Sequence, residues 1–213
     1  MSTKKVTYYS KLEETANVVT HGAGLILSFP ALFYLVYLAL EKGTTTHLFS
    51  FVTFGICMII LYAASTFYHA VQEEKLRRKL NIFDHAAIFV LIAGSYTPFM
   101  LLGLEGTWKW AMFILTWSIA IAGIIFKLFY TGRFNKASTF MYIAAGWVVV
   151  IAYKPLGEGL PADSIKWAVI GGLSYTVGAF LYMIKKIPYN HAIFHLFALG
   201  GTISHFIAVT YLV

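Results

Sequence analysis

Hydrophobic residues along this chain gather into seven long runs that are separated by short polar segments. Most of these runs approach the roughly 20 apolar residues that an α-helix needs to cross the hydrocarbon core of a bilayer. The runs cover residues 18–40, 48–69, 82–102, 110–129, 138–153, 165–184 and 191–213, and the fifth is the shortest. We therefore predict an all-α integral membrane protein with seven transmembrane helices.

Composition supports this prediction and narrows the classes of function. The chain is 59% hydrophobic and 12% charged, whereas a soluble domain carries about 25% charged residues. We expect one transmembrane domain over residues 1–213, in which residues 1–17 form a cytoplasmic N-terminal segment. The formal net charge of +7 is typical of loops that face the cytoplasm and does not indicate nucleic-acid binding. The oligomeric state stays open.

Lysine and arginine residues between the runs predict the orientation, because cytoplasmic loops of membrane proteins carry an excess of these residues. Twelve fall on the side of the N-terminus and four on the other side. The first group comprises Lys4, Lys5, Lys11, Lys75, Arg77, Arg78, Lys79, Lys127, Arg133, Lys136, Lys185 and Lys186, and the second comprises Lys42, Lys109, Lys154 and Lys166. We predict a cytoplasmic N-terminus and an external C-terminus.

Three histidines form a candidate metal site in this topology. His191 and His195 are four residues apart at the start of the last run, so a helix places them on one face. His69 ends the second run, which brings it to the same leaflet. Three imidazoles and a water complete a tetrahedral zinc site with an open position, although copper, nickel and iron remain alternatives. Taken alone, His69 could simply be a polar side chain that reaches the interface.

Two further residues at this leaflet suit catalysis by a bound metal. Zinc lowers the pKa of its water to about 7 and polarises a carbonyl group. Asp84, at the start of the third run, could orient or deprotonate that water, or it could instead cap the third helix. Ser65, one turn before His69, could donate a hydrogen bond to the water or to a developing oxyanion.

A second polar group lies on the first helix. Glu14, Asn17 and His21 follow each other at spacings of three and four residues, so they share one helical face. They could support the metal ligands, contact the substrate or supply a fourth ligand, or Glu14 and Asn17 could merely solvate the helix start. His205 lies ten residues after His195, about 15 Å further along the helix. We expect His205 to pair separately with a buried polar group such as a threonine or a serine.

Together these motifs resemble the hemolysin III family, the bacterial relatives of the progestin and adipoQ receptors, which include the adiponectin receptors. The matching pieces span nearly the whole chain. They are Glu14-x2-Asn17-x3-His21-Gly22, Ser65-x3-His69, Asp84-His85 with the later Gly94 to Pro98 segment, His191-x3-His195, and Ser204-His205-Phe206.

The resemblance implies a multi-pass protein of the bacterial plasma membrane, in which zinc is held by His69, His191 and His195. It also implies that Asp84 lies near the zinc-bound water, and His85 joins the candidates for support of the metal or contact with the substrate. The first hypothesis is a ceramidase-like zinc hydrolase that acts on membrane lipids. The second is a non-enzymatic cytolysin or lipid-sensing regulator with structural zinc. A transporter is disfavoured, because these ionisable residues gather at one end of the helices and form no relay across the membrane.

Overall fold

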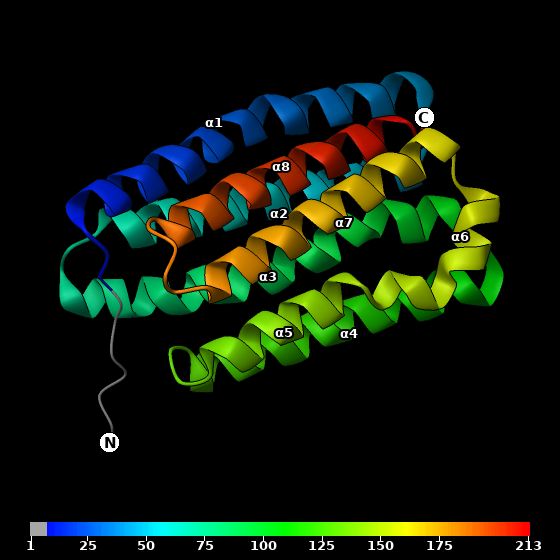
Figure 1. Cartoon of the computed structure of the whole chain (residues 1–213). Coiled ribbons are helices and arrows are strands. Elements are labelled where there is room, and N and C mark those ends of the chain that lie inside the picture. Colours follow the sequence, from blue (N-terminus) through cyan, green and yellow to red (C-terminus); the bar gives the residue numbers. More distant parts are fainter. Residues whose placement is uncertain (1–7) are drawn as a thin grey trace.

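The computed structural model describes residues 8–213. Within this range the chain forms eight α-helices and one short 3-10 helix, which run back and forth as a bundle (Figure 1). Their order is α1 (Lys11–Lys42), α2 (Thr45–Ala70), α3 (Glu74–Gly103), α4 (Gly106–Tyr130), α5 (Asn135–Gly146), η1 (Val148–Ala152), α6 (Tyr153–Gly159), α7 (Ala162–Met183) and α8 (Asn190–Thr210).

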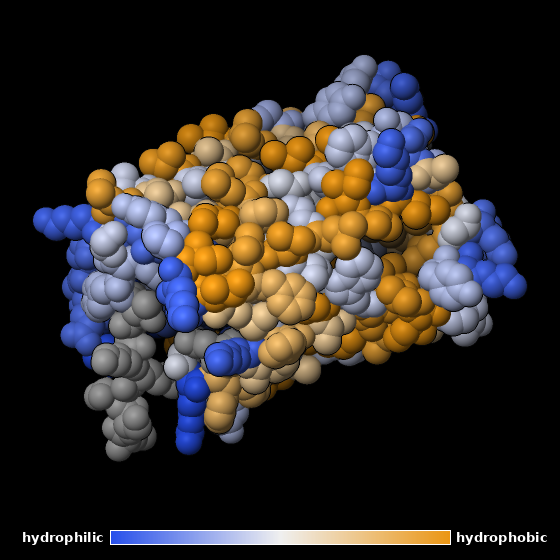
Figure 2. Space-filling view, viewed as in Figure 1, coloured by the Kyte–Doolittle hydropathy of each residue, from blue (hydrophilic) through white to orange (hydrophobic). Residues whose placement is uncertain are grey.

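The described helices provide seven spans that are long and apolar enough to cross a membrane, which confirms the predicted number. Hydrophobic side chains cover the middle of the bundle, whereas hydrophilic residues gather at its two ends (Figure 2). Large apolar side chains such as Ile26 and Phe33 point outward, each 71% exposed, which suits contact with lipid rather than water. The protein is therefore a multi-pass membrane protein. Which end of the bundle faces the cytoplasm stays a prediction.

Helix α3 lies in the interior, packed between α2 and α4, and α8 packs against both α7 and α1. This arrangement brings the end of α2, the beginning of α3 and the beginning of α8 to one end of the bundle (Figure 1). The C-terminus lies at the opposite end (Figure 1). All the residues of the predicted metal site therefore lie at one end of the protein.

The fifth span is broken, whereas the sequence predicted one helix over residues 138–153. Residues Lys136–Gly159 cross as α5, η1 and α6 in succession. Pro155 lies in the first turn of α6, where its missing N–H is tolerated, and a proline here would disrupt a continuous helix. The hydroxyl of Tyr96 donates a hydrogen bond to the Gly146 carbonyl at the end of α5. Helix α3 thus satisfies a backbone group that lies at the break.

Helices α1 and α3 begin seven and eight residues earlier than the hydrophobic pattern predicts. Helix α1 begins at Lys11 after Ser10, whose hydroxyl accepts a hydrogen bond from the Glu13 N–H at 3.2 Å, as a helix cap does. Residues 11–17 of the predicted N-terminal segment are therefore helical, while residues 1–7 lie outside the described residues. Helix α3 begins at Glu74 instead of residue 82, so Asp84 lies well inside the helix and does not cap it.

Candidate metal centre

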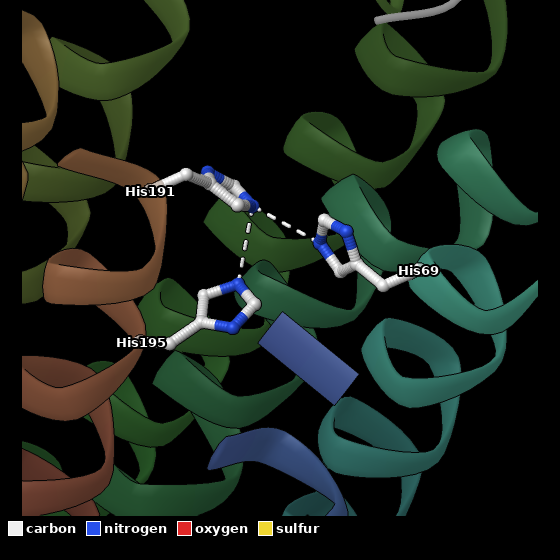
Figure 3. A group of neighbouring side chains, drawn as sticks. All are labelled: His69, His191 and His195. Carbon is white, nitrogen blue, oxygen red and sulfur yellow. Dashed lines mark hydrogen bonds between the residues drawn. The ribbon is translucent and has the colours of Figure 1, made fainter. Parts of the chain in front are cut away.

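Three buried histidine side chains point toward one another at this end of the bundle (Figure 3). The Nε2 atom of His191 lies 3.0 Å from Nε2 of His69 and 3.1 Å from Nε2 of His195. His69 is in the last turn of α2, and the other two are in the first two turns of α8. We refer to these three residues as the histidine triad.

The geometry of the triad fits a metal ion. All three ligand atoms lie within 4.8 Å of one another, and nitrogens bound at about 2.0–2.1 Å to tetrahedral zinc lie about 3.3 Å apart. Three imidazoles leave a fourth position open for water or substrate. Among the described residues this ligand group contains the three histidines and not Asp84.

The turn between α7 and α8 sets the position of His191. Tyr189 has a φ of 56°, a left-handed conformation that is rare for a side chain of this size. The Asn190 side chain donates a hydrogen bond of 2.6 Å to the carbonyl of Tyr182 near the end of α7. This contact ties the first residue of α8 to the preceding helix, and so it fixes the position of His191, the second residue of α8.

The carboxylate of Glu14 orients the ring of His69, and the Asn17 side chain lies beside it. The Glu14 Oε2 atom lies 2.7 Å from His69 Nδ1, and the Asn17 amide nitrogen lies 3.3 Å from the same atom. A carboxylate that accepts the Nδ1–H of a histidine leaves Nε2 as the lone-pair donor, as in many carboxylate–histidine–metal groups. Both residues are buried, so the alternative in which they merely solvate the helix start is wrong.

Arg77 was counted among the loop charges, but it is fully buried in the first turn of α3. Its guanidinium forms an ion pair with Glu14 and donates hydrogen bonds to the carbonyls of Tyr68 and Val71, at 3.1 and 2.9 Å. Arg77 therefore connects the carboxylate behind His69 to the end of α2. Arg77 lies seven residues before Asp84, so the two residues share one face of α3. This spacing is the feature of the sequence that could have indicated the burial of Arg77.

His21 and Ser65 form a second contact behind the triad. The Ser65 hydroxyl lies 2.7 Å from His21 Nδ1, and the His21 ring stacks on the His195 ring with centroids 3.5 Å apart. The Thr20 hydroxyl lies 3.4 Å from His195 Nδ1. The structure thus places Ser65 against His21, and His21 rather than Ser65 lines the cavity described next.

A long cavity of about 320 Å³ begins at the triad and runs between α3, the broken fifth span, α7 and α8. His21, Asp84, His85, His191 and His195 line one end. The cavity wall also includes Phe99, which lies fifteen residues after Asp84, about 22 Å along the axis of α3. Most of the remaining wall is apolar. A narrow apolar space of this length with polar groups at one end suits a hydrocarbon chain.

Lys127 is a second buried cation that the charge count assigned to a loop. Its Nζ atom donates a hydrogen bond of 2.5 Å to Ser138 and lies 5.2 Å from the centre of the Tyr142 ring. Both of those residues line the cavity, and Lys127 also interacts electrostatically with Asp84. His85, beside Asp84, is held by a 2.8 Å hydrogen bond between its Nδ1 and the Asn81 carbonyl.

Tyr9, just before α1, covers the triad. Its ring stacks on His191 with centroids 4.8 Å apart, and its N–H donates a hydrogen bond of 3.1 Å to Glu14 Oε1. Burial raises the pKa of the Tyr9 phenol well above its ordinary value, so the hydroxyl stays protonated. Hydropathy gave no signal for this residue, because it lies outside the apolar runs.

Comparison with known proteins supports the resemblance to the hemolysin III family over nearly the whole chain. Residues 9–206 match the protein family described as Haemolysin-III related. Hemolysin-3 of Bacillus cereus is 44% identical over 213 residues, which cover 99% of this chain and 97% of that protein. The Hemolysin-3 homolog of Bacillus subtilis (strain 168) is 44% identical over 93% of each chain. The Adiponectin receptor protein of Drosophila melanogaster is 23% identical over 91% of this chain and 49% of that protein.

Proposed function

We propose that this chain, which belongs to the haemolysin-III family, binds zinc at its histidine triad and hydrolyses an amide or ester bond of a membrane lipid. This activity would serve the homeostasis of the membrane. One observation carries the proposal: the triad stands at the polar end of a long apolar cavity that Asp84 also lines. A metal and a carboxylate at the end of a space for a hydrocarbon chain suit hydrolysis next to that chain.

A zinc ion in this position would supply a water of lowered pKa and would polarise the lipid carbonyl. The residues of the chain would do the rest. Glu14 accepts a hydrogen bond from Nδ1 of His69, so the Nε2 lone pair of His69 faces the other two histidines of the triad. Asp84 would accept a proton at the cavity end, and the apolar wall would hold the acyl chain and exclude bulk water.

We further propose that the triad lies at the cytoplasmic leaflet of a bacterial plasma membrane. Removal of the buried Arg77 and Lys127 from the charge count leaves ten basic residues on the N-terminal side and four on the other. The excess therefore still favours a cytoplasmic N-terminus. The substrate would then be a lipid that reaches this leaflet.

A second candidate function is non-enzymatic, and the names of the two Bacillus relatives favour it. In this alternative the chain is a cytolysin or a lipid-sensing regulator, and zinc only ties α2 to α8. The three ligands come from these two helices, so a structural ion would have the same stabilising effect. Metal binding alone does not separate the two functions.

The deciding experiment is hydrolysis of a panel of ceramides and glycerolipids by purified protein in lipid nanodiscs, with zinc content measured on the same samples. The enzyme proposal expects turnover in the wild type and its loss in Asp84→Asn with zinc retained. The matched control is Asp163→Asn, which removes an exposed carboxylate from the first turn of α7. Leakage of dye from vesicles without any lipid hydrolysis would instead support the cytolysin.

A further inference from the structure

The far end of the cavity lies where α6 meets the end of α3. Phe99 is the wall residue of α3 that lies furthest from the triad, although the helix continues to Gly103. Leu156 in α6 and Leu160, directly after that helix, also line the cavity. We refer to Phe99, Leu156 and Leu160 as the cavity floor. All three are apolar, so this end offers a chain only van der Waals contacts.

Two glycines allow α6 to close this end against α3. An added Cβ at Gly159 would lie 2.0 Å from the carbonyl oxygen of Gly103, so the two backbones touch. An added Cβ at Gly103 would lie 2.3 Å from Cδ2 of Leu160. The Leu160 side chain therefore packs directly on the last residue of α3, and the space beyond Phe99 is filled on this side.

A neighbouring ring holds Phe99 in place. The ring of His205 in α8 meets the Phe99 ring edge to face, with centroids 6.1 Å apart. The Nε2 atom of His205 lies 3.2 Å from the carbonyl of Ala168 in α7. His205 thus has the separate polar partner that the sequence predicted, although this partner is a backbone carbonyl and not a hydroxyl. With 3% of its surface exposed, Phe99 has little freedom to move aside.

The helix geometry gives the length of chain that fits above the floor. Asp84 and Phe99 are separated by about 22 Å along the axis of α3. A terminal methyl stops about 4 Å short of the Phe99 ring, which leaves about 18 Å. Carbon–carbon bonds of about 1.5 Å at angles near 111° advance an extended chain by about 1.25 Å per carbon. The space therefore holds roughly 15–16 carbons.

We propose that the cavity floor limits the length of the acyl chain, so that the protein prefers lipids whose acyl chain is about as long as that of palmitic acid. This inference rests on the proposed function, because it assumes that the polar end of the lipid lies at the triad. Shorter chains leave part of the apolar wall without contacts. Longer chains press against Phe99 and Leu160.

The test is competition between saturated fatty acids, the products of the proposed hydrolysis, for the cavity of the full-length protein in lipid nanodiscs. Lauric, palmitic, arachidic and behenic acids are added at equal mole fractions in the bilayer, and each displaces a fluorescent fatty acid. We expect palmitic acid to displace the probe best. Behenic acid should bind about 5–100-fold more weakly, the effect of overpacking a closed space.

Phe99→Ala should move this limit. The lost ring extends about 4 Å beyond Cβ, the length of about three chain carbons, so arachidic acid should now bind better than palmitic acid. Leu160→Ala opens the same end and provides a second variant if Phe99→Ala fails to fold. Phe89→Ala is the matched control, because Phe89 is an equally buried ring of α3 that packs toward Gly123 of α4, outside the cavity wall. It should keep the order of the wild type.

Behenic acid that binds the wild type as tightly as palmitic acid would overturn the inference, because the chain would then leave the cavity sideways into the bilayer. An unchanged order of acids in both Phe99→Ala and Leu160→Ala would also overturn it. Failure of the probe or of every acid to bind would contradict the proposed function as well. The comparison in the wild type needs no variant, so it stands by itself.

Discussion

Replacement of Glu14 by glutamine removes two interactions that share one carboxylate. Oε2 of Glu14 contacts His69 Nδ1 at 2.7 Å, and Oε1 forms an ion pair with Arg77. The Arg77 and Glu14 side chains are 0% and 9% exposed, so water screens this pair little. Glu14→Gln keeps the shape of the side chain and removes its charge, which affects the metal ligand and the buried cation at the same time.

The losses of stability and of metal affinity differ in size, and a second substitution should restore only the stability. Loss of one partner from a buried ion pair costs about 3–5 kcal/mol, because the other charge stays buried and uncompensated. Loss of the carboxylate behind a metal-bound histidine weakens metal affinity by about 10–100-fold. Glu14→Gln combined with Arg77→Met should recover much of the stability, since the buried charge is gone, but should not recover the metal affinity.

Thermal unfolding of the metal-free protein reports the first effect, and competition with a zinc-chelating dye reports the second. The single variants Glu14→Gln and Arg77→Met complete the cycle with the double variant. The reasoning is refuted if Glu14→Gln binds zinc as tightly as the wild type, or if the double variant is no more stable than Glu14→Gln. Arg78→Met is the control, because Arg78 pairs with Glu74 at a partly exposed site where ion pairs contribute little.

Three other outcomes are expected. Asp84→Asn should retain its zinc and lose hydrolysis by about 10²–10⁴-fold; loss of the metal in this variant would make Asp84 a ligand. Tyr9→Ala should lose zinc to a chelator faster than the wild type, because the ring that stacks on His191 is gone; an unchanged rate of extraction would show that Tyr9 is not a barrier. A reporter fused after Val213 should be active only if it functions outside the cytoplasm, and a cytoplasmic signal would reverse the proposed orientation.

Much of the architecture could be predicted from the sequence, because membrane spans and helical spacing are local properties. Runs of apolar residues gave the seven spans, and the spacing of His191 and His195 placed both on one helical face. His69 joined them because the alternating direction of the helices brings the end of the second span to the start of the seventh. The pairing of Glu14 with His69 follows the same logic, since both occur at this end of the bundle.

The residues that the sequence missed depend on contacts between distant segments. Arg77 and Lys127 look like loop charges, and partners on other helices, among them Glu14 on α1 and Ser138 on α5, make their burial possible. The break in the fifth span likewise depends on Tyr96 of α3, whose hydroxyl binds the carbonyl of Gly146. No pattern within one segment contains these partners.

The most direct test of the account is the zinc content of the purified chain, measured by mass spectrometry of metals in the wild type and in the double variant His191→Ala/His195→Ala. His47→Ala is the control, because His47 lies at the other end of the bundle, where its Nε2 contacts the carbonyl of Leu212 at 3.0 Å. We expect one zinc per chain in the wild type and the control, and almost none in the double variant, which should also melt at a lower temperature. A double variant that still holds one zinc per chain would contradict the account.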